Sequence, residues 1–433
     1  MTALQALDRT IRLCRDYVAD ELSGEEICKS LQSTQILCIS DTANLSSHSG
    51  QVTLVTLVSL LSRMGMQVAV RIPETTLLSS QPPASGQDLR TALVGLSESL
   101  VPDAKVYYDL NFAPDIVFAL GDSELAYYRA PCWRLNGSAW LGTLAFEGVA
   151  PRMTWTVEWP VGAMVSAALA AGEAFKFAIR RLPLRNQSDR VFIEQSEYCQ
   201  WDFGPVTVPR GGIDLGRLDV ISAGAISQAA LYVLIRLPGV RVACRIFDDD
   251  TTAISNLNRN MLTVLSDVGI KKVWVVADRC AGRLQLDPVD RRFPDGWSDN
   301  ERLAPRVLIG VDDIPSRWEA QRRAPGWLAV SGTSHFAVSS SSHGPAQPCG
   351  GCLHPVDDPG GTDPIPTVSF VSFWAGLTMA VRLIREAIGT PYDPKHQHLW
   401  LSALRMDQRN GAMWLPVASR HDCPVGCLAS RNS

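Results

Sequence analysis

The chain has 433 residues, which is enough for two or three domains that each bury a hydrophobic core. Hydrophobic residues make up 46% of the chain and charged residues 19%, which excludes a disordered chain. The net charge of −4 provides no basic surface, so we expect no nucleic-acid partner and no contact with an anionic membrane.

The start of the chain lacks a basic segment followed by an apolar core, so we expect no signal peptide. The most apolar stretch, residues 161–179, contains Glu173 and Lys176 and does not read as a membrane span. A cytoplasmic protein is therefore expected. Eleven cysteines in such a chain indicate buried thiols and a metal site rather than disulfides.

The first part of the chain predicts one amphipathic helix and then a strand, a helix and a strand. Residues 4–22 have the apolar spacing of the helix, with Arg9 and Arg12 on its solvated face. The strand-helix-strand unit is predicted at residues 36–40, 52–64 and 67–72.

A strand at residues 115–120 and a long helix at 160–181 complete this first part. Its first loop has no early glycine. We interpret this part as one copy of an internal duplication that keeps the fold without the nucleotide-binding residues. An unrelated α/β domain is the alternative.

After a linker at residues 182–202, a second strand-helix-strand unit is predicted at 219–222, 229–237 and 240–247. A turn of small residues around Gly224 leaves the amides of the helix free to face a phosphate. An acid at the tip of the second strand can bind ribose hydroxyls. Taken alone, the turn is a degraded dinucleotide fingerprint, because serines stand where two glycines are usual.

The remaining elements are strands at residues 307–311 and 327–331, a long apolar helix at 367–388 and a final hairpin. The hairpin has strands at 398–406 and 413–418 around the turn Arg-Asn-Gly.

The residues that follow the second unit have a distinctive spacing. Asp248 and Asp250 are followed after four residues by Ser-Asn-Leu-Asn-Arg, which ends at Arg259, and Lys272 comes thirteen residues later. This order resembles the ThiF-type adenylating enzymes of the ubiquitin-activating, molybdopterin and thiamin pathways. The later Val-Asp-Asp-(x3)-Arg, which contains Asp312, resembles the Thr-Asp-Asn-(x3)-Arg of that family.

The resemblance implies an enzyme that joins a carboxylate to the α-phosphate of ATP and releases pyrophosphate. Negative charge spreads over the phosphates in such a reaction, so cations and a metal-binding carboxylate are needed. The resemblance gives Arg259 and Lys272 the role of phosphate-facing cations and Asp312 that of the Mg²⁺ ligand. Four further residues are implied in nucleotide binding: Gly224, Asp248, Asp250 and Asn256.

Residues 7–13, Leu-Asp-Arg-Thr-Ile-Arg-Leu, resemble the signature Tyr-Asp-Arg-Gln-Ile-Arg-Leu of ubiquitin-activating-type enzymes. In that family the first arginine reaches the ATP phosphates of the other half of the dimer. The resemblance therefore implies that Arg9 contacts phosphate, although the chain departs from the signature at Leu7 and Thr10.

Two close pairs of cysteines predict a zinc site. Cys349 and Cys352 are separated by two residues, and Cys423 and Cys427 by three, where two are usual. Four thiolates suit tetrahedral Zn²⁺. The family has a closed, structural zinc site in the same place.

The chain lacks the cysteine with which some members of the family form a thioester. Family members that form a thioester place a cysteine shortly after the first pair, often in Pro-x-Cys-Thr, and Pro366 stands at that position here. Cys280, Cys199 and Cys132 remain as candidates, with buried, unreactive thiols as the alternative.

Together these observations predict an α/β fold with two Rossmann-like adenylation domains in one chain, a pseudo-dimer. Residues 1–185 would be inactive, and residues 195–433 would be active and carry the zinc. The expected partner is a small ubiquitin-like protein or peptide with a free C-terminus, and a conjugating enzyme and a homodimer are left open. The alternatives are peptide modification or sulfur transfer, and a non-catalytic scaffold that binds a partner.

Overall fold

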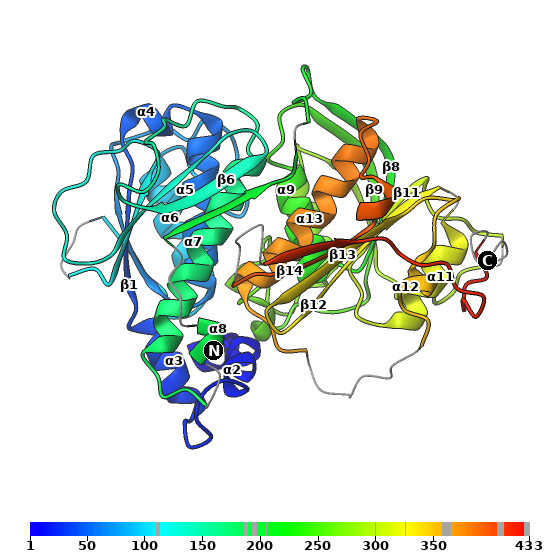
Figure 1. Cartoon of the computed structure of the whole chain (residues 1–433), viewed down its shortest axis with the longest axis horizontal. Coiled ribbons are helices and arrows are strands. Elements are labelled where there is room, and N and C mark those ends of the chain that lie inside the picture. The colour runs from blue at the N-terminus through cyan, green and yellow to red at the C-terminus, as the bar shows by residue number, and fades with distance from the viewer. Residues whose placement is uncertain are drawn as a thin grey trace.

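The computed structural model describes residues 1–108, 113–185, 189–192, 197–204, 206–298, 300–324, 326–356, 365–404 and 411–427. It shows an α/β fold with two sheets, each mixed and mostly parallel, which confirms the predicted fold class. The two sheets lie in separate halves of the molecule, with helices between them (Figure 1). We call the residues up to 204 the first half and those from 206 the second half.

The first half contains a seven-stranded sheet. Its strands are β1 (Gln35–Ile39), β2 (Gln67–Arg71), β3 (Val106–Tyr107), β4 (Ile116–Leu120), β5 (Cys132–Gly137), β6 (Leu141–Phe146) and β7 (Tyr198–Asp202). The order is β3-β2-β1-β4-β5-β6-β7, and only the pairs β5–β6 and β6–β7 are antiparallel. Its helices are α1 (Ala3–Ala6), α2 (Asp8–Arg15), α3 (Gly24–Gln32), α4 (Thr42–Leu45), α5 (His48–Arg63), α6 (Leu89–Glu98), α7 (Val161–Arg180) and α8 (Asp189–Phe192).

The second half contains an eight-stranded sheet. Its strands are β8 (Ile213–Ile221), β9 (Val240–Phe247), β10 (Gln285–Val289), β11 (Arg306–Ile309), β12 (Trp327–Ser334), β13 (Ala337–His343), β14 (His398–Ser402) and β15 (Ala412–Leu415). The order β10-β9-β8-β11-β12-β13-β14 repeats that of the first sheet, and β15 is added at the edge. The fold is thus duplicated within the chain.

The second half has five α-helices and three short 3₁₀ helices among its described residues. They are α9 (Ala225–Leu234), η1 (Ile254–Asn256), η2 (Leu265–Asp267), α10 (Lys272–Cys280), α11 (Ile314–Arg323), α12 (Gly350–Leu353), α13 (Ser369–Ala387) and η3 (Pro394–His396).

Four helices, α5, α7, α9 and α13, form the centre of the molecule and share one continuous hydrophobic core. Aromatic rings meet across the halves, with the centroids of Phe175 and Phe370 5.5 Å apart. By length and composition α7 is apolar enough to cross a membrane, but 94% of its most apolar window is buried inside the protein. A core helix passes the same test, and α7 has that position.

Several elements differ from the sequence-based expectations. The helix predicted at residues 4–22 is broken at Leu7, whose backbone leaves the helical region (φ −90°, ψ 6°), so that α1 and α2 are separate. The predicted linker contains α8 and β7, and β7 extends the first sheet although it falls inside the predicted second domain. The turn Arg409-Asn410-Gly411 lies mostly outside the described residues, but its strands do pair as β14 and β15.

The crossing of α9 and α13 depends on a glycine. A Cβ at Gly376 would lie 2.5 Å from the carbonyl oxygen of Ile226, so the helices touch backbone to backbone there. We expect Gly376→Ala to lower the free energy of unfolding by about 1–3 kcal/mol, because the helices must separate.

The control is Gly95→Ala in α6, where nothing lies within 4 Å of the added methyl. It should stabilise the chain by about 0.5–1 kcal/mol through helix propensity. Urea unfolding measures both, and equal values would contradict this account of the helix crossing.

Candidate active site and candidate metal centre

The turn between β8 and α9 is held in one geometry. Ser222 has a left-handed backbone (φ 82°), and its Oγ accepts a hydrogen bond from the amide of Gly224 at 2.9 Å. The amide of Ala223 donates to Oδ2 of Asp248 at 2.7 Å. Gly224 is the N-cap of α9 and has no side chain to cover the first amides of the helix. These amides are therefore available to an anion.

The acids after β9 and the following loop support each other. Asp248 is 8% exposed, and its Oδ1 accepts from the amide of Asp250 at 2.8 Å. Asp250 forms an ion pair with Lys272 at the start of α10. The Oδ1 of Asn256 accepts from the amide of Ala253 at 2.8 Å, so this side chain orders the loop. Each carboxylate oxygen of Asp248 accepts one protein amide and keeps a lone pair for a further donor, and the role of Asp248 toward a ribose stays a prediction.

Asp312 lies just after β11 with four cations around it. Solvent reaches its side chain, but crowding by protein atoms raises the pKa of the carboxyl group. Arg317, Arg259, Arg9 and Lys272 are all close enough to lower that pKa in return, in this order of strength. The structure therefore brings together the four residues that the sequence placed at the reaction centre, and Arg317 with them.

Arg259 and Arg9 lie beside each other. Burial, together with the neighbouring charge of Arg9, lowers the pKa of Arg259 to about 10. Arg259 donates to the carbonyl oxygen of Ser255 and, at 2.9 Å, to Oδ1 of Asn258. The two like charges repel each other, and an anion bound near both would relieve the repulsion.

The N-terminal helix reaches the second half through a polar contact. Asn258 donates from Nδ2 to Oγ1 of Thr10 at 2.9 Å and to the carbonyl oxygen of Thr367 at 3.4 Å. Arg9 donates to the carbonyl oxygen of Ile365 at 3.4 Å. These contacts place α2 over the loop that carries Arg259. Thr10 departs from the family signature, and here it is the partner of Asn258.

Sequence reasoning did not select Gly310 or Arg317 as site residues. A Cβ at Gly310 would lie 2.5 Å from Oγ of Ser227, so glycine is needed where β11 ends against α9. Arg317 donates from Nε to the carbonyl oxygen of Val311 at 2.9 Å, which aims its charge at the site. Arg317 could have been found in the sequence, because it is the arginine of the Val-Asp-Asp-(x3)-Arg motif. No sequence pattern pointed to Gly310.

The matching position in the first half is filled by its own side chains. Asn44 donates from Nδ2 to Asp41 and to Asp122, each at 2.9 Å, and Asp122 also accepts from Thr154 at 2.6 Å. Asp122 follows β4 as Asp312 follows β11. The polar groups at this end of the first sheet therefore satisfy one another.

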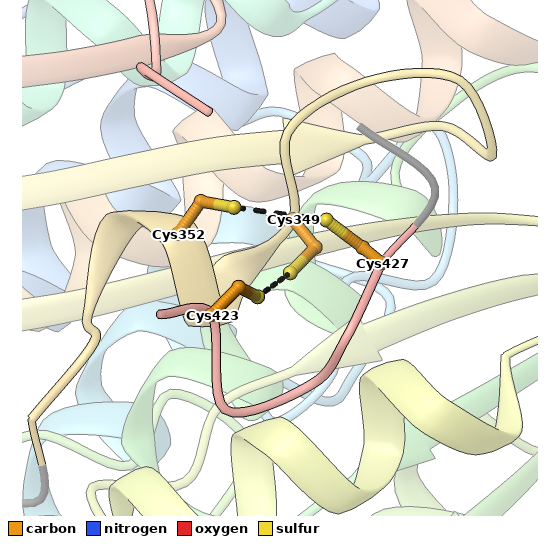
Figure 2. A group of neighbouring side chains, drawn as sticks. All are labelled: Cys349, Cys352, Cys423 and Cys427. Atoms are coloured by element: carbon orange, nitrogen blue, oxygen red, sulfur yellow. Dashed lines mark hydrogen bonds between the residues drawn. The ribbon is translucent and has the colours of Figure 1, made fainter. Parts of the chain in front are cut away.

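The four cysteines of the two predicted pairs converge near the C-terminus (Figure 2). All their sulfur atoms lie within 4.8 Å of one another, with Cys349–Cys423 at 3.3 Å and Cys352–Cys427 at 3.6 Å. Zinc bound to four thiolates at about 2.3 Å places the sulfurs about 3.8 Å apart, so the cluster fits that ion. Burial raises the pKa of the Cys349 and Cys352 thiols, so their deprotonation needs a cation.

Helix α11 connects the cysteine cluster to the charged site. It begins just after Asp312, and Trp318 donates from Nε1 to the carbonyl oxygen of His354 at 2.9 Å. Gln321 accepts from the amide of Gly350 at 3.1 Å, and Arg322 donates to Pro424 at 2.7 Å. The cluster thus holds the helix whose first turn carries Arg317.

The three cysteines considered as thioester candidates lie in unfavourable surroundings. Cys280 and Cys199 are buried, and burial raises the pKa of Cys280 to about 12. Cys132 is half-buried, and burial raises its pKa as well. None of these environments favours a reactive thiolate.

Comparison with known proteins gives three findings. Residues 35–188 match the sequence model of the BilD N-terminal domain. The chain is 23% identical over 366 residues to the uncharacterized protein y4jF of Sinorhizobium fredii, an alignment that covers 82% of this chain and 66% of that protein. The chain therefore spans slightly less than two thirds of the length of this relative.

Among solved structures, the chain is similar to E. coli MccB in its crystal structures with ATP and with succinimide. Each has a TM-score of 0.39 and 15% sequence identity, and the match covers 48% of this chain and 66% of MccB. A third MccB structure, with MccA-N7isoASN, gives a TM-score of 0.38.

The cysteine cluster predicts bound zinc. Metal analysis of the purified chain should give about one zinc per chain, and Cys349→Ser should lower both the zinc content and the melting temperature, because a structural zinc contributes to folding free energy. Cys132→Ser is the matched control, since Cys132 lies in the first half and outside the cluster. Full stability of the metal-free protein would contradict the assignment.

Proposed function

We propose that the chain is an adenylating enzyme that uses ATP and Mg²⁺. The observation that carries the proposal is the gathering of Arg9, Arg259, Lys272 and Arg317 around Asp312. This cluster lies at the carboxyl end of β11, beside the open N-terminus of α9. Crevices at the carboxyl ends of parallel strands are the usual ligand sites of such sheets.

The arrangement suits transfer of an adenylyl group. A carboxylate oxygen of the substrate attacks the α-phosphorus of ATP, the bond from that phosphorus to the bridging oxygen breaks, and pyrophosphate leaves. The four cations would stabilise the charge that develops on the phosphates. An ionised Asp312 offers the oxygen ligand that Mg²⁺ prefers, and a metal held there would help to neutralise the negative charge of the phosphates. The turn at Gly224 would bind phosphate through backbone amides.

We propose as substrate the C-terminal carboxylate of a small ubiquitin-like protein or peptide, which leaves as an acyl-adenylate. We further propose that a conjugating enzyme accepts the activated acyl group. The chain itself is proposed to form a homodimer and to be cytoplasmic. The segment with Pro366 runs beside the charged site, since the flanking carbonyls of Ile365 and Thr367 contact Arg9 and Asn258. A residue without a thiol at this place favours direct transfer from the adenylate. It also favours the second candidate, peptide modification or sulfur transfer without a thioester on this chain.

Asp312→Asn should abolish the reaction while the chain remains folded. We expect ATP–pyrophosphate exchange to fall about 100-fold or more. The assay uses the small protein or peptide that co-purifies with the chain or is encoded beside it. The folded-state pKa of Asp312 is raised, so its ionised form costs stability at neutral pH, and the neutral amide removes that cost.

The matched control is Asp122→Asn at the equivalent position of the first half, where exchange should continue. Unchanged exchange in Asp312→Asn, with ATP binding intact, would rule out the proposed role of this carboxylate.

Arg9 and Arg12 lie three positions apart on α2 and provide a second test. The Arg9 side chain is 19% exposed, whereas Arg12 is 44% exposed and is bonded to Asp8 at 3.1 Å. Arg9→Ala should weaken ATP binding about tenfold, or about 1.4 kcal/mol, through loss of a charge-assisted phosphate contact. Arg12→Ala should change the affinity by less than about 0.5 kcal/mol. Calorimetric titration with ATP and Mg²⁺ measures both, and a loss in Arg12→Ala alone would show that the register of the signature is wrong.

A further inference from the structure

A buried arginine of the first half enters the loop that follows Arg259. Arg63, at the last position of α5, is fully buried. Its Nη1 donates to the carbonyl oxygen of Leu257 at 2.6 Å, and its Nη2 donates to those of Met261 and Thr263, both at 3.0 Å. One guanidinium group therefore satisfies three carbonyls of the other half, on both sides of Arg259.

The same loop is also held by α9. Gln228 accepts through Oε1 from the amide of Leu262 at 3.1 Å and from Oγ1 of Thr263 at 3.0 Å. Its Nε2 donates to the carbonyl oxygen of Ala223 at 2.9 Å, in the turn before α9. The loop with Arg259 is thereby tied to the turn with Gly224, and Arg63 completes the set of hydrogen bonds.

The second half has a counterpart to Arg63. Arg236 follows α9 as Arg63 ends α5, and it is also buried. It donates to the carbonyl oxygens of Gln81 and Pro82 in the first half, at 3.2 and 2.9 Å. Both arginines precede a related strand sequence, Val-Ala-Val-Arg-Ile at residues 68–72 and Val-Ala-Cys-Arg-Ile at 242–246. The duplication thus gives each half a buried arginine that binds carbonyl oxygens of the other half. Of these two arginines, only Arg63 contacts the loop that carries Arg259.

We propose that Arg63 is a positioning residue for the candidate nucleotide site, which fixes the segment from Asn256 to Arg259 from the first half. The inference rests on the proposed function for the ligand concerned. Lysine at this position has no planar fork and cannot serve three carbonyls in this geometry. Buried carbonyl groups that lose their hydrogen-bond donor must bind water or move, and the loop that carries Arg259 would move with them. A shift of about 1 Å in a phosphate-facing arginine lowers reaction rates up to about 100-fold.

The test compares Arg63→Lys with Arg236→Lys. Arg236 is the equivalent arginine, but it does not contact the loop that carries Arg259. We expect Arg63→Lys to weaken binding of ATP with Mg²⁺ about tenfold, and Arg236→Lys to leave it within about twofold. Amide hydrogen exchange should rise at residues 255–265 in Arg63→Lys and at 75–87 in Arg236→Lys. Arg63→Met should bind ATP more weakly than Arg63→Lys, because it retains no donor.

Three outcomes would overturn the inference. The first is an unchanged affinity of Arg63→Lys for ATP with Mg²⁺, and the second is an equal loss of that affinity in both lysine variants at matched melting temperature. The third is unchanged amide hydrogen exchange at residues 255–265 in Arg63→Lys. Arg259→Ala separates this failure from failure of the proposed function. If the wild type binds ATP and Arg259→Ala does not, while Arg63→Lys binds normally, only the positioning role fails. If the wild type itself binds no ATP, the proposed function fails and the inference with it.

Discussion

Burial of four helices between two sheets is the constraint on which the rest of the structure depends. Parallel strands need cover on both faces, and α5, α7, α9 and α13 cover the inner face of both sheets at once (Figure 1), while separate hydrophobic clusters lie against the strand residues of the other faces. A helix in that position has no solvated side, so α7 is composed mainly of alanine and other small or apolar residues, and α13 approaches α9 through Gly376. Neither sheet can be moved without opening the shared core.

The shared core also determines how charge reaches the candidate active site. Cations there come from α2, from the loop before η2, from α10 and from α11, so no single element carries the site. Two of these elements are fixed by contacts to another part of the fold: Asn258 holds α2, and the segment that carries the cysteine cluster holds α11. A preorganised set of cations of this kind stabilises developing charge without having to rearrange.

Residue types at fixed spacing allowed much of the fold and site to be predicted. Strand β9 was predicted with its observed bounds, and the cysteine pairs and the Asp312 neighbours do converge. Strands β5, β6 and β13 were not predicted, and neither was α11, whose mixture of charged, small and aromatic residues gives no clear period. Arg63 and the Asn258–Thr10 pair were also missed, because partners 194 to 248 positions apart leave no local pattern.

The two halves differ in how the polar groups at the ends of their parallel strands are satisfied. In the first half, Asn44 joins Asp41 and Asp122 into a closed network, and a Cβ at Gly121 would collide with it. In the second half, Arg259 binds backbone and amide oxygens, and the charged neighbour with the largest effect on its pKa is another cation. A closed network gains nothing from a ligand, whereas adjacent guanidinium groups gain from an anion. One topology therefore supports a scaffold in one copy and a site for an anion in the other, and the difference requires only a few side chains.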